Sequence, residues 1–437
     1  MSLKLYNSSY KLGEICLQIT DGKHGDCENQ ENSGYYFVSV KDIDDDEINY
    51  SNARQITKFD FEDTDRRTKL ENEDILITNS GTIGKFVFVN SPLSRKTTFQ
   101  KSVAIIKPNK NKIIPKFLYY YLISEKRQLV EYAGGTTQKN LLLRDIRNFE
   151  VKIPDESRQK KIIMILNDID QLISVNKKLN KNLDELCHSL FKYYFIDFIP
   201  FCDDDFIDSD IGEIPKEWSI TTVGNILDCK LGGTPSRSNE SYWGGSIAWI
   251  NSGKVNDFRI IEPSEYITEK GLKKSATKLL PAKTTVIAIT GATLGQISLL
   301  EIDSCANQSV IGIIPNINYP YEFVYPLISS ILIDLLKHQT GGAQQHINKN
   351  NVESFKIICP PAEIISEYKT IVSPIYSKIS DNCFEIEKLQ KLRDTLLPKL
   401  MSGEIDVSKI NCDLELKYNY MKYLFNQIHT QMSKSVV

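Results

Sequence analysis

Short apolar runs bounded by Gly, Asn, Asp and Pro follow one another along residues 10–153. Runs of β-branched and aromatic residues with such boundaries are typical of strands. We therefore expect strands at 35–40, 74–78, 86–89 and 103–106. Apolar residues at helical spacing behind Pro115 predict a helix at 117–130.

The same order of patterns returns in residues 222–360, with strands expected at 247–250, 285–289 and 297–300 and a helix at 323–338. Short strings repeat as well, about 207 to 211 positions apart, as in Ser80–Gly84 and Gly291–Gly295. A duplication of this size predicts two similar β-rich domains related by a pseudo-two-fold axis. Such a chain presents two similar surfaces, and duplex DNA is a common partner with matching symmetry.

Between the copies, residues 158–198 carry apolar side chains at alternating intervals of four and three, which is the pattern of a coiled-coil seam. The seam positions are Ile165, Ile169, Leu172, Asn176, Leu179, Leu183, Leu186, Leu190 and Tyr193. Residues 363–401 carry a second such segment. Each helix of about 40 residues would be ~60 Å long. Pro374 either kinks the second helix or marks its start, with Ser373 as N-cap.

One polar residue lies near the middle of each helical segment. Asn176 falls in the first seam, and the repeat places Asn382 at the matching point of the second. Midpoints meet in an antiparallel pair, and a buried unpaired amide costs ~1–3 kcal/mol. We therefore expect Asn176 and Asn382 to hydrogen-bond and fix the register. The alternative is that both reach solvent at a loose crossing.

Composition and charge indicate which classes of protein this chain is compatible with. The 437 residues carry a net charge of −3, so bulk positive charge does not draw the chain to DNA, although local basic patches remain compatible with DNA binding. No apolar run is long enough to span a bilayer, and the first residues lack the apolar core of a signal peptide. Nine scattered cysteines and five unclustered histidines predict reduced cytoplasmic thiols and no metal site.

Motifs for catalysis and cofactor binding are missing. No Gly-x-Gly-x-x-Gly string opens a helix, which argues against a dinucleotide or S-adenosylmethionine pocket of the ordinary kind. The string Gly81–Lys85 fails as a phosphate loop, because Asn79 replaces the first glycine and Phe86 follows the lysine. We find no string of the kind with which adenine methyltransferases hold a flipped base. The chain is therefore expected to be non-catalytic and to hold no cofactor.

Several strings, in this order, resemble the specificity subunits of type I restriction–modification systems. They are Gly212–Trp218, Gly232–Ser236, Tyr242–Ile250, Gly291–Gly295 and Leu396–Ile405. The resemblance covers roughly residues 10–405 and is looser in the first half, where Asn79–Gly84 stands for the glycine turn. It implies an α+β fold with two β-rich target-recognition domains separated by two long antiparallel helices, each domain reading half of a bipartite site.

The resemblance also implies an organisation and a set of partners. Residues 1–155 and 200–361 would be the two target-recognition domains, the second including a linker. Residues 156–199 and 362–403 would be spacer helices, and 404–437 a C-terminal tail with helical spacing. The partners would be double-stranded DNA, two methyltransferase (M) subunits on the helices, and restriction and motor (R) subunits through the complex. S-adenosylmethionine and ATP would bind to those partner subunits.

The repeat also separates candidate DNA contacts into two groups. If the half-sites differ, residues shared by both copies cannot discriminate bases and are scaffold or phosphate contacts: Thr82, Gly84, Gln100, Gly134, Gly135, Gln138, Thr293, Gly295, Gln308, Gly341, Gly342 and Gln345. Positions that differ within the same loops are candidates for base reading: Lys23, His24, Lys85, Lys139, Asn140, Thr234, Arg237, Gln296 and His346.

Two other readings remain open from the sequence. A two-headed adaptor could bind protein or glycan through the duplicated domains, or an enzyme could carry an active site without a familiar motif.

Overall fold

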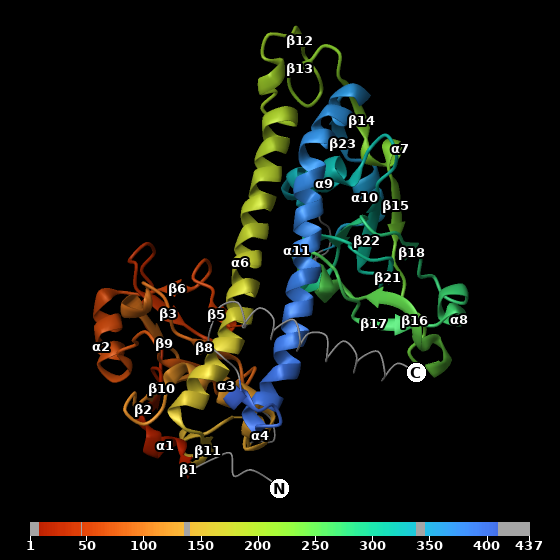
Figure 1. Ribbon diagram of the computed structural model, residues 1–437. Coiled ribbons are helices and arrows are strands. Elements are labelled where there is room, and N and C mark those ends of the chain that lie inside the picture. Colours follow the sequence, from red (N-terminus) through yellow and green to blue (C-terminus); the bar gives the residue numbers. More distant parts are fainter. Residues whose placement is uncertain (1–7, 45, 135–139, 338–345, 410–437) are drawn as a thin grey trace. The chain divides into compact units, whose positions relative to one another are not determined.

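The computed structural model describes residues 8–44, 46–134, 140–337 and 346–409. The chain forms two compact units, Met1–Gln171 with Leu389–Val437, and Leu172–Lys388. Two long helices, α6 (Glu156–Phe195) and α11 (Ala362–Ser402), contribute to both units (Figure 1). Each unit therefore combines one β-rich domain with parts of both helices. Within the described residues, no helix has the length and apolar character needed to cross a membrane.

The first unit is built on an antiparallel sheet of four strands. Its elements are β1 (Ser8–Lys11), α1 (Leu12–Ile15), β2 (Cys16–Asp21), β3 (Tyr36–Val38), β4 (Ile43–Asp44), β5 (Glu47–Ile48), β6 (Arg54–Gln55), α2 (Lys58–Thr68), β7 (Ile75–Thr78), β8 (Phe86–Phe88), β9 (Thr97–Phe99), β10 (Val103–Pro108), α3 (Pro115–Ser124), α4 (Lys126–Glu131), α5 (Leu143–Asn148) and β11 (Glu150–Ile153). The main sheet has the order β2-β10-β7-β8. A second sheet has the order β6-β3-β9, and β1 pairs with β11.

The second unit repeats this topology. Its elements are β12 (Phe206–Ile207), β13 (Ile214–Pro215), β14 (Ser219–Thr222), α7 (Val223–Ile226), β15 (Asp228–Leu231), β16 (Trp243–Ile250), β17 (Glu265–Ile267), α8 (Glu269–Lys273), β18 (Leu279–Leu280), β19 (Thr285–Ala288), β20 (Ile297–Leu299), β21 (Ser304–Ala306), β22 (Val310–Ile314), α9 (Tyr321–Leu336), α10 (Lys349–Glu353) and β23 (Lys356–Cys359). The main sheet has the order β15-β22-β19-β20, beside β17-β16-β21-β18, and β14 pairs with β23. The predicted duplication of a β-rich domain is confirmed.

Central strands explain why the sequence shows continuous apolar runs instead of strict alternation. Strands β7 and β19 each lie between two neighbours in the main sheet, and all of their residues are buried. A strand that is covered on both faces has no polar side. The run of four apolar or small residues therefore identifies the centre of each domain.

Two helix predictions need correction. The helix expected at 117–130 is divided into α3 and α4, with Glu125 between them in a non-helical conformation. The second long helix begins at Ala362 and continues through Pro374, so this proline does not mark its start. Ser373 is not an N-cap; its Oγ donates to Glu322 Oε1 at 2.6 Å.

The two long helices run antiparallel within the second unit. Asn180 of α6 contacts Ile379 and Cys383 of α11 through its amide nitrogen, 3.3 Å from the Ile379 oxygen and from the Cys383 sulfur. Further along α6, the carbonyl of Cys187 accepts from the hydroxyl of Tyr368 at 3.4 Å. Higher numbers on α6 thus face lower numbers on α11, which is the expected direction.

The buried seam of α6 in this unit lies one position later than the sequence analysis expected. Four seam residues expected from the sequence are 37–49% exposed, namely Leu172, Leu179, Leu186 and Tyr193. The residues that directly follow the first three of them are buried, namely Ile173, Asn180 and Cys187. Adjacent apolar residues produce two stripes with the same period, and the pattern alone cannot select between them. Packing against α11 and the domain selects the later stripe.

The asparagine pair follows this shift. Asn382 donates from Nδ2 to Oδ1 of Asn180 at 2.8 Å, and both residues are buried. The partner expected from the sequence, Asn176, lies one turn earlier and is half-buried. The prediction of an asparagine pair across the helices is correct in kind and wrong in one member, because the register is set by the later stripe.

Hydrogen bonds to aspartates of α6 join each domain to its helical segment. In the second unit, the fully buried guanidinium of Arg259 donates to Asp184 of α6 at 2.8 Å and to the hydroxyl of Tyr325 at 3.3 Å. In the first unit, Asp170 of α6 accepts from Arg393 of α11 at 3.2 Å and from Tyr120 of α3 at 2.6 Å. A buried charge is costly unless it is paired, so these contacts favour one orientation of each domain on the helices.

We expect Asn180→Ala to lower the free energy of unfolding by about 1–3 kcal/mol, because it leaves the buried amide of Asn382 without its acceptor. Urea denaturation followed by circular dichroism measures the change. Asn176→Ala is the matched control on the same helix, with an expected change within about 0.5 kcal/mol. Equal destabilisation by the two substitutions would contradict the assignment of Asn180 as the seam residue.

Candidate nucleic-acid interface

Loops from different strands meet at one end of the main sheet in the first domain. Lys23, just after β2, donates its backbone N–H to Phe99 O at 2.8 Å. Asn79, just after β7, donates to Ser102 O at 3.0 Å, and Leu141 donates to Asn79 O at 2.8 Å. The segments that carry the sequence-predicted contact residues are therefore held together by backbone hydrogen bonds.

The second domain holds its loops with the same bonds at equivalent positions. Gly233 donates to Ala306 O at 2.7 Å, Ile289 to Ser309 O at 2.9 Å, and Ile347 to Ile289 O at 3.1 Å. The two domains thus share one backbone frame for this loop cluster, while the side chains on it differ.

Two glycines in this frame were not among the sequence-predicted contacts. A Cβ on Gly22 would lie 1.9 Å from Phe99 O, and a Cβ on Gly232 would lie 2.1 Å from Asn307 O. No side chain fits at either position, because the backbone of the glycine lies directly against the backbone at Phe99 or at Asn307. The repeat carries the signal that could have found them, since both glycines follow the same strand in their domains.

The glycine turns after β7 and β19 adopt a left-handed backbone at corresponding points. The φ angles are 85° at Gly84 and 83° at Gly295. Each predicted threonine lies within its turn: Thr78 Oγ1 donates to Thr82 O at 2.6 Å, and Thr293 Oγ1 lies 3.3 Å from Thr290 O. These residues shape the turns through backbone geometry.

In the first domain, three described candidates contact other groups of the protein. Lys23 Nζ lies 2.9 Å from Asp60 Oδ1, and this hydrogen bond raises the pKa of the lysine. His24 Nε2 lies 3.0 Å from Asp21 Oδ2. Lys85 Nζ donates to the Ile43 carbonyl. For these groups, contact with DNA would require exchange of an internal partner.

Two other members of the first loop cluster are described. Asn140 is exposed and donates its backbone N–H to Gly134 O at 2.8 Å. Gln100 is half-buried and forms a backbone bridge with Lys23. Their side chains lie on the segments that the cluster brings together.

In the second domain, the described candidates differ in their exposure and in the contacts that they make. Thr234 Oγ1 donates to Gln308 Oε1 at 2.5 Å, so one discriminating candidate contacts one shared candidate. Arg237 donates from both terminal nitrogens to Glu265, at 2.6 and 2.7 Å. Gln296 and His346 are exposed, and the backbone of His346 bridges to Thr290.

Six candidate residues lie outside the described part of the chain. They are Gly135, Gln138, Lys139, Gly341, Gly342 and Gln345.

Hydrogen bonds from arginine lower the pKa of two carboxylates, one in each domain. The bond from Arg237 lowers the pKa of Glu265, and the bond from Arg54 lowers the pKa of Asp26. Sequence reasoning gave no sign of Glu265, Asp26 or Arg54, because the partners lie more than 25 positions apart in the chain. Both pairs are charged at neutral pH.

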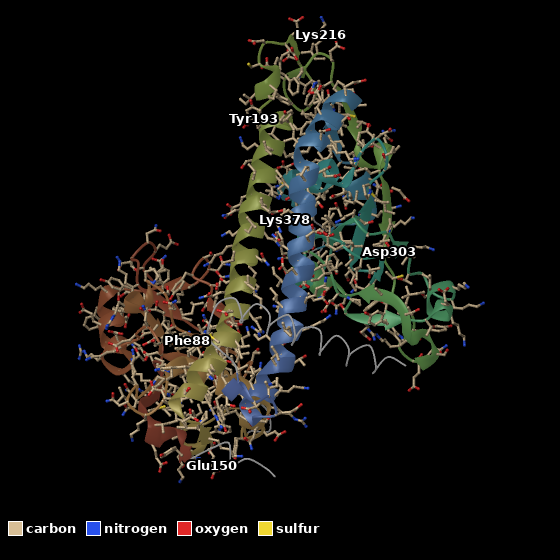
Figure 2. The ribbon with its side chains drawn as sticks, in the orientation of Figure 1. Phe88, Glu150, Tyr193, Lys216, Asp303 and Lys378 are labelled. Carbon is tan, nitrogen blue, oxygen red and sulfur yellow. The ribbon has the colours of Figure 1, made fainter. Side chains whose placement is uncertain are left out.

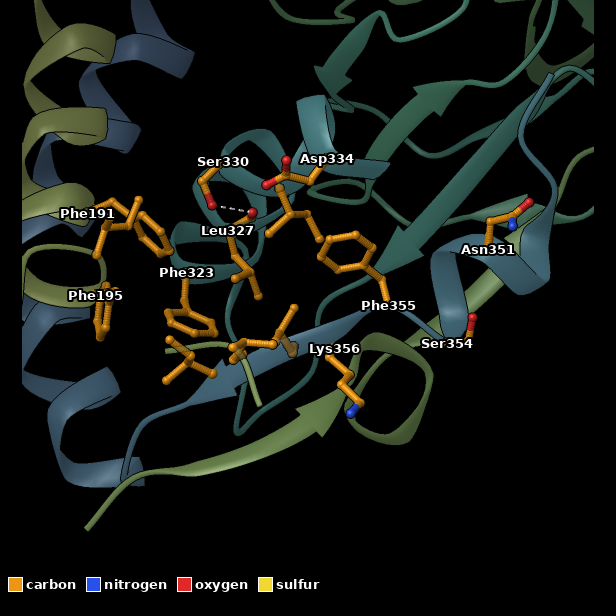
Figure 3. A pocket seen from close by; sticks show the side chains of 15 residues that line it. Phe191, Phe195, Phe323, Leu327, Ser330, Asp334, Asn351, Ser354, Phe355 and Lys356 are labelled. Carbon is orange, nitrogen blue, oxygen red and sulfur yellow. Dashed lines mark hydrogen bonds between the residues drawn. The ribbon is translucent and has the colours of Figure 1, made fainter. Parts of the chain in front are cut away.

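A separate cavity of about 580 Å³ lies in the second unit, lined mainly by apolar side chains (Figure 3). Phe191, Phe195 and Phe323 form part of its wall. Its basic lining residue, Lys356, is paired with Asp210 at 2.7 Å. This lining is not suited to a nucleic-acid backbone. Within the described residues, no cluster of His, Cys, Asp or Glu could hold a metal ion.

We expect Gly22→Ala and Gly232→Ala each to destabilise its own domain by about 1–3 kcal/mol or more, because the added methyl group collides with a backbone carbonyl. Thermal unfolding measures the effect. Gly134→Ala is the control, since a Cβ there meets nothing within 4 Å. Unchanged melting of the Gly22 and Gly232 variants would show that the loop can move away at little cost.

Comparisons with known proteins agree with this architecture. The sequence matches the family described as Type I restriction modification DNA specificity domain, over residues 7–185 and again over 215–394. The MjaIX specificity subunit of Methanocaldococcus jannaschii is 28% identical over 77% of this chain and 78% of its own. The HindI specificity subunit of Haemophilus influenzae is 25% identical, over 74% of this chain and 84% of its own.

A solved structure shares the fold. The crystal structure of a type I restriction–modification S subunit from M. genitalium gives a TM-score of 0.53 at 16% identity, covering 92% of this chain and 97% of that chain. Both copies of the duplicated domain fall within the matched family, and the long helices α6 and α11 pack together beside them. This protein therefore belongs to the type I restriction–modification specificity subunits, the non-catalytic subunits that generally confer DNA target specificity.

Proposed function

We propose that each β-rich domain of this chain reads one half of a bipartite site in double-stranded DNA. The observation that carries the proposal is the repeated loop cluster, in which the same backbone hydrogen bonds hold different side chains in the two domains. A shared frame lets both domains dock on duplex DNA in the same way. Different side chains on that frame would then select different bases.

Base reading is assigned to the positions that differ between the copies. In the first domain they are Lys23, His24, Lys85, Lys139 and Asn140; in the second they are Thr234, Gln296 and His346, with Arg237 considered separately below. The shared positions, including Thr82, Thr293, Gln100 and Gln308, are assigned to scaffold or phosphate contacts. A well-placed bidentate contact to a base gives ~1–3 kcal/mol of discrimination, so a few such groups suffice for a short half-site.

The helices are assigned the roles of spacer and docking surface. Residues 1–155 and 200–361 would be the target-recognition domains, and the helices at 156–199 and 362–403 would set the distance between the half-sites. A helix of 40 residues, such as α6, is ~60 Å long, which is less than two turns of DNA at ~34–36 Å each. Two methyltransferase subunits would bind the helices, and restriction and motor subunits would join through the complex, all in the cytoplasm.

An apolar stripe on the outside of α6 supports the docking role. Leu172, Leu179, Leu186 and Tyr193 recur at intervals of seven and are 37–49% exposed. Tyr193 is labelled on α6 in Figure 2. Val175 on the same helix is 59% exposed. A regular exposed apolar stripe on a helix is typical of a surface that receives another helix. S-adenosylmethionine and ATP would be held by the partner subunits.

Replacement of residues 1–155 by the equivalent domain of another specificity subunit should change one half of the recognised sequence and leave the other half intact. Each domain carries its own loop cluster, so the second half-site depends on residues that are kept. Sequencing of methylated positions in DNA from cells that express the hybrid with methyltransferase subunits measures both halves. A change in both halves, or DNA binding that is independent of sequence, would contradict the proposal.

We expect Leu179→Glu with Leu186→Glu to reduce co-purification of methyltransferase subunits at least about tenfold, because two charges would be placed within an apolar contact. Both positions point away from the buried seam, so the melting temperature should change little. Lys178→Glu, an exposed substitution on the same helix, is the control. Undiminished assembly of the double variant would exclude this face of α6 as the docking surface.

A further inference from the structure

The two domains carry an ion pair at the same place with opposite polarity. In the first domain, Arg54 on β6 donates to Asp26, in the loop after β2, at 2.5 Å. In the second domain, Glu265 on β17 accepts from Arg237, in the loop after β15, at 2.6 and 2.7 Å. The strand supplies the cation in one copy and the anion in the other.

Strand register shows that the two positions are equivalent. Arg54 is the antiparallel partner of Phe37, which is the parallel partner of Thr98 on β9. Glu265 is the antiparallel partner of Trp249, which is the parallel partner of Cys305 on β21. The loop members lie at similar distances along their loops, since Asp26 follows Gly22 by four residues and Arg237 follows Gly232 by five.

Both arginines lie over the aromatic ring at this shared position. The guanidinium carbon of Arg54 is 5.6 Å from the centre of the Phe37 ring, and that of Arg237 is 5.2 Å from the Trp249 ring. Trp249 also donates its indole N–H to Gly233 O at 3.1 Å. The aromatic ring at this position therefore accommodates a guanidinium group, whether the arginine comes from the strand or from the loop.

Each pair closes the loop that carries candidate reading residues. Beyond Asp26, Arg54 donates to Asn29 Oδ1 and to Cys27 O, so it holds several positions of the first loop. In the second loop, Trp243 donates to Ser236 O at 3.2 Å and lies 3.6 Å from the guanidinium of Arg237. The loop that begins at Gly22 or Gly232 is thus fixed at its far end to the strand opposite.

We propose that these loop–strand ion pairs, Arg54–Asp26 and Arg237–Glu265, are positioning pairs that set the base preference of their own domains, and that Arg237 is not itself a base-reading residue. A bidentate contact to guanine needs two donors in one fork, and the fork of Arg237 is occupied by Glu265. One face of the same guanidinium lies against Trp243. Arg237 therefore acts on neighbours such as Thr234, through the shape of the loop. The inference rests on the proposed function.

Opposite polarity in the two domains provides the test. If the pair only fixes the loop, exchanging its charges in the second domain reproduces the polarity that the first domain already uses. If Arg237 reads a base, the exchange removes the reading group and cannot restore recognition. Both partners are partly exposed, so their substitution should not prevent folding.

The experiment uses the full-length chain assembled with its methyltransferase subunits and a duplex DNA library with randomised positions. Sequencing of the bound fraction gives the preference for each base in both half-sites. Arg237→Glu and Glu265→Arg should each reduce the preference for the correct bases in one half-site about tenfold, which is the scale of one base contact. The double exchange should recover most of that preference. The half-site read by the first domain is an internal control in every variant.

A matched control comes from another exposed ion pair in the same domain. Lys273 and Glu269 on α8 lie 3.7 Å apart, and Lys273→Glu should leave both half-sites unchanged. Melting temperatures show whether each variant is folded. For the first domain, Arg54→Asp should affect the other half-site. Arg54→Asp with Asp26→Arg should restore only part of it, because the bonds from Arg54 to Asn29 and Cys27 are not replaced.

The outcomes separate the inference from the function on which it rests. Recovery by the double exchange supports positioning. A double exchange as defective as Arg237→Glu, with Glu265→Arg near wild type, would overturn the inference and make Arg237 a reading residue. Absence of any sequence preference in the wild-type complex would instead overturn the proposed function.

Discussion

Apolar packing along the paired helices is the constraint on which the second unit depends. Phe191 and Phe195 of α6 and Tyr368 and Tyr376 of α11 belong to the same buried core as Phe323 of α9. Burying each such side chain contributes roughly 1.5–3 kcal/mol. The helices therefore contribute to the stability of the domain and do not form a separate stalk. A domain that shares its core with the helices cannot turn on them without exposing that core. Its loops are therefore held at a fixed angle to the helix axis.

Polar groups within this apolar packing restrict it to one arrangement. Asn382 donates to Asn180 in this register, and a shift of the helices that separated the two would leave the buried amide of Asn382 without its acceptor. Arg259 restricts the domain in the same way, because its buried guanidinium donates both to Asp184 of α6 and to the hydroxyl of Tyr325. Apolar contacts supply most of the stabilisation, whereas these polar contacts select between arrangements of similar apolar content.

The two copies share one backbone arrangement and differ in the side chains that it carries. Gly22 and Gly232 occupy the same crossing of two loops, where any side chain would collide with a carbonyl oxygen. The ion pair at the far end of the same loop is kept in place but reversed in charge, as Arg54 and Glu265 show. Steric limits on a backbone are strict and local, while an ion pair needs only complementary charges. Similar domains can therefore carry different surfaces on one scaffold.

The sequence alone determined the duplication, the strand-rich domains, the two long helices and the absence of familiar catalytic motifs. Central strands such as β7 and β19 were evident from their apolar runs, because they are buried on both faces. Only the tertiary structure decided which stripe of α6 is buried, since Leu172 and Ile173, like Leu186 and Cys187, offer the same spacing on adjacent faces. That choice made Asn180, rather than Asn176, the partner of Asn382. The pairing of Arg237 with Glu265 was likewise decided by the tertiary structure, because the short strand β17 that carries Glu265 was not recognisable from the local sequence pattern.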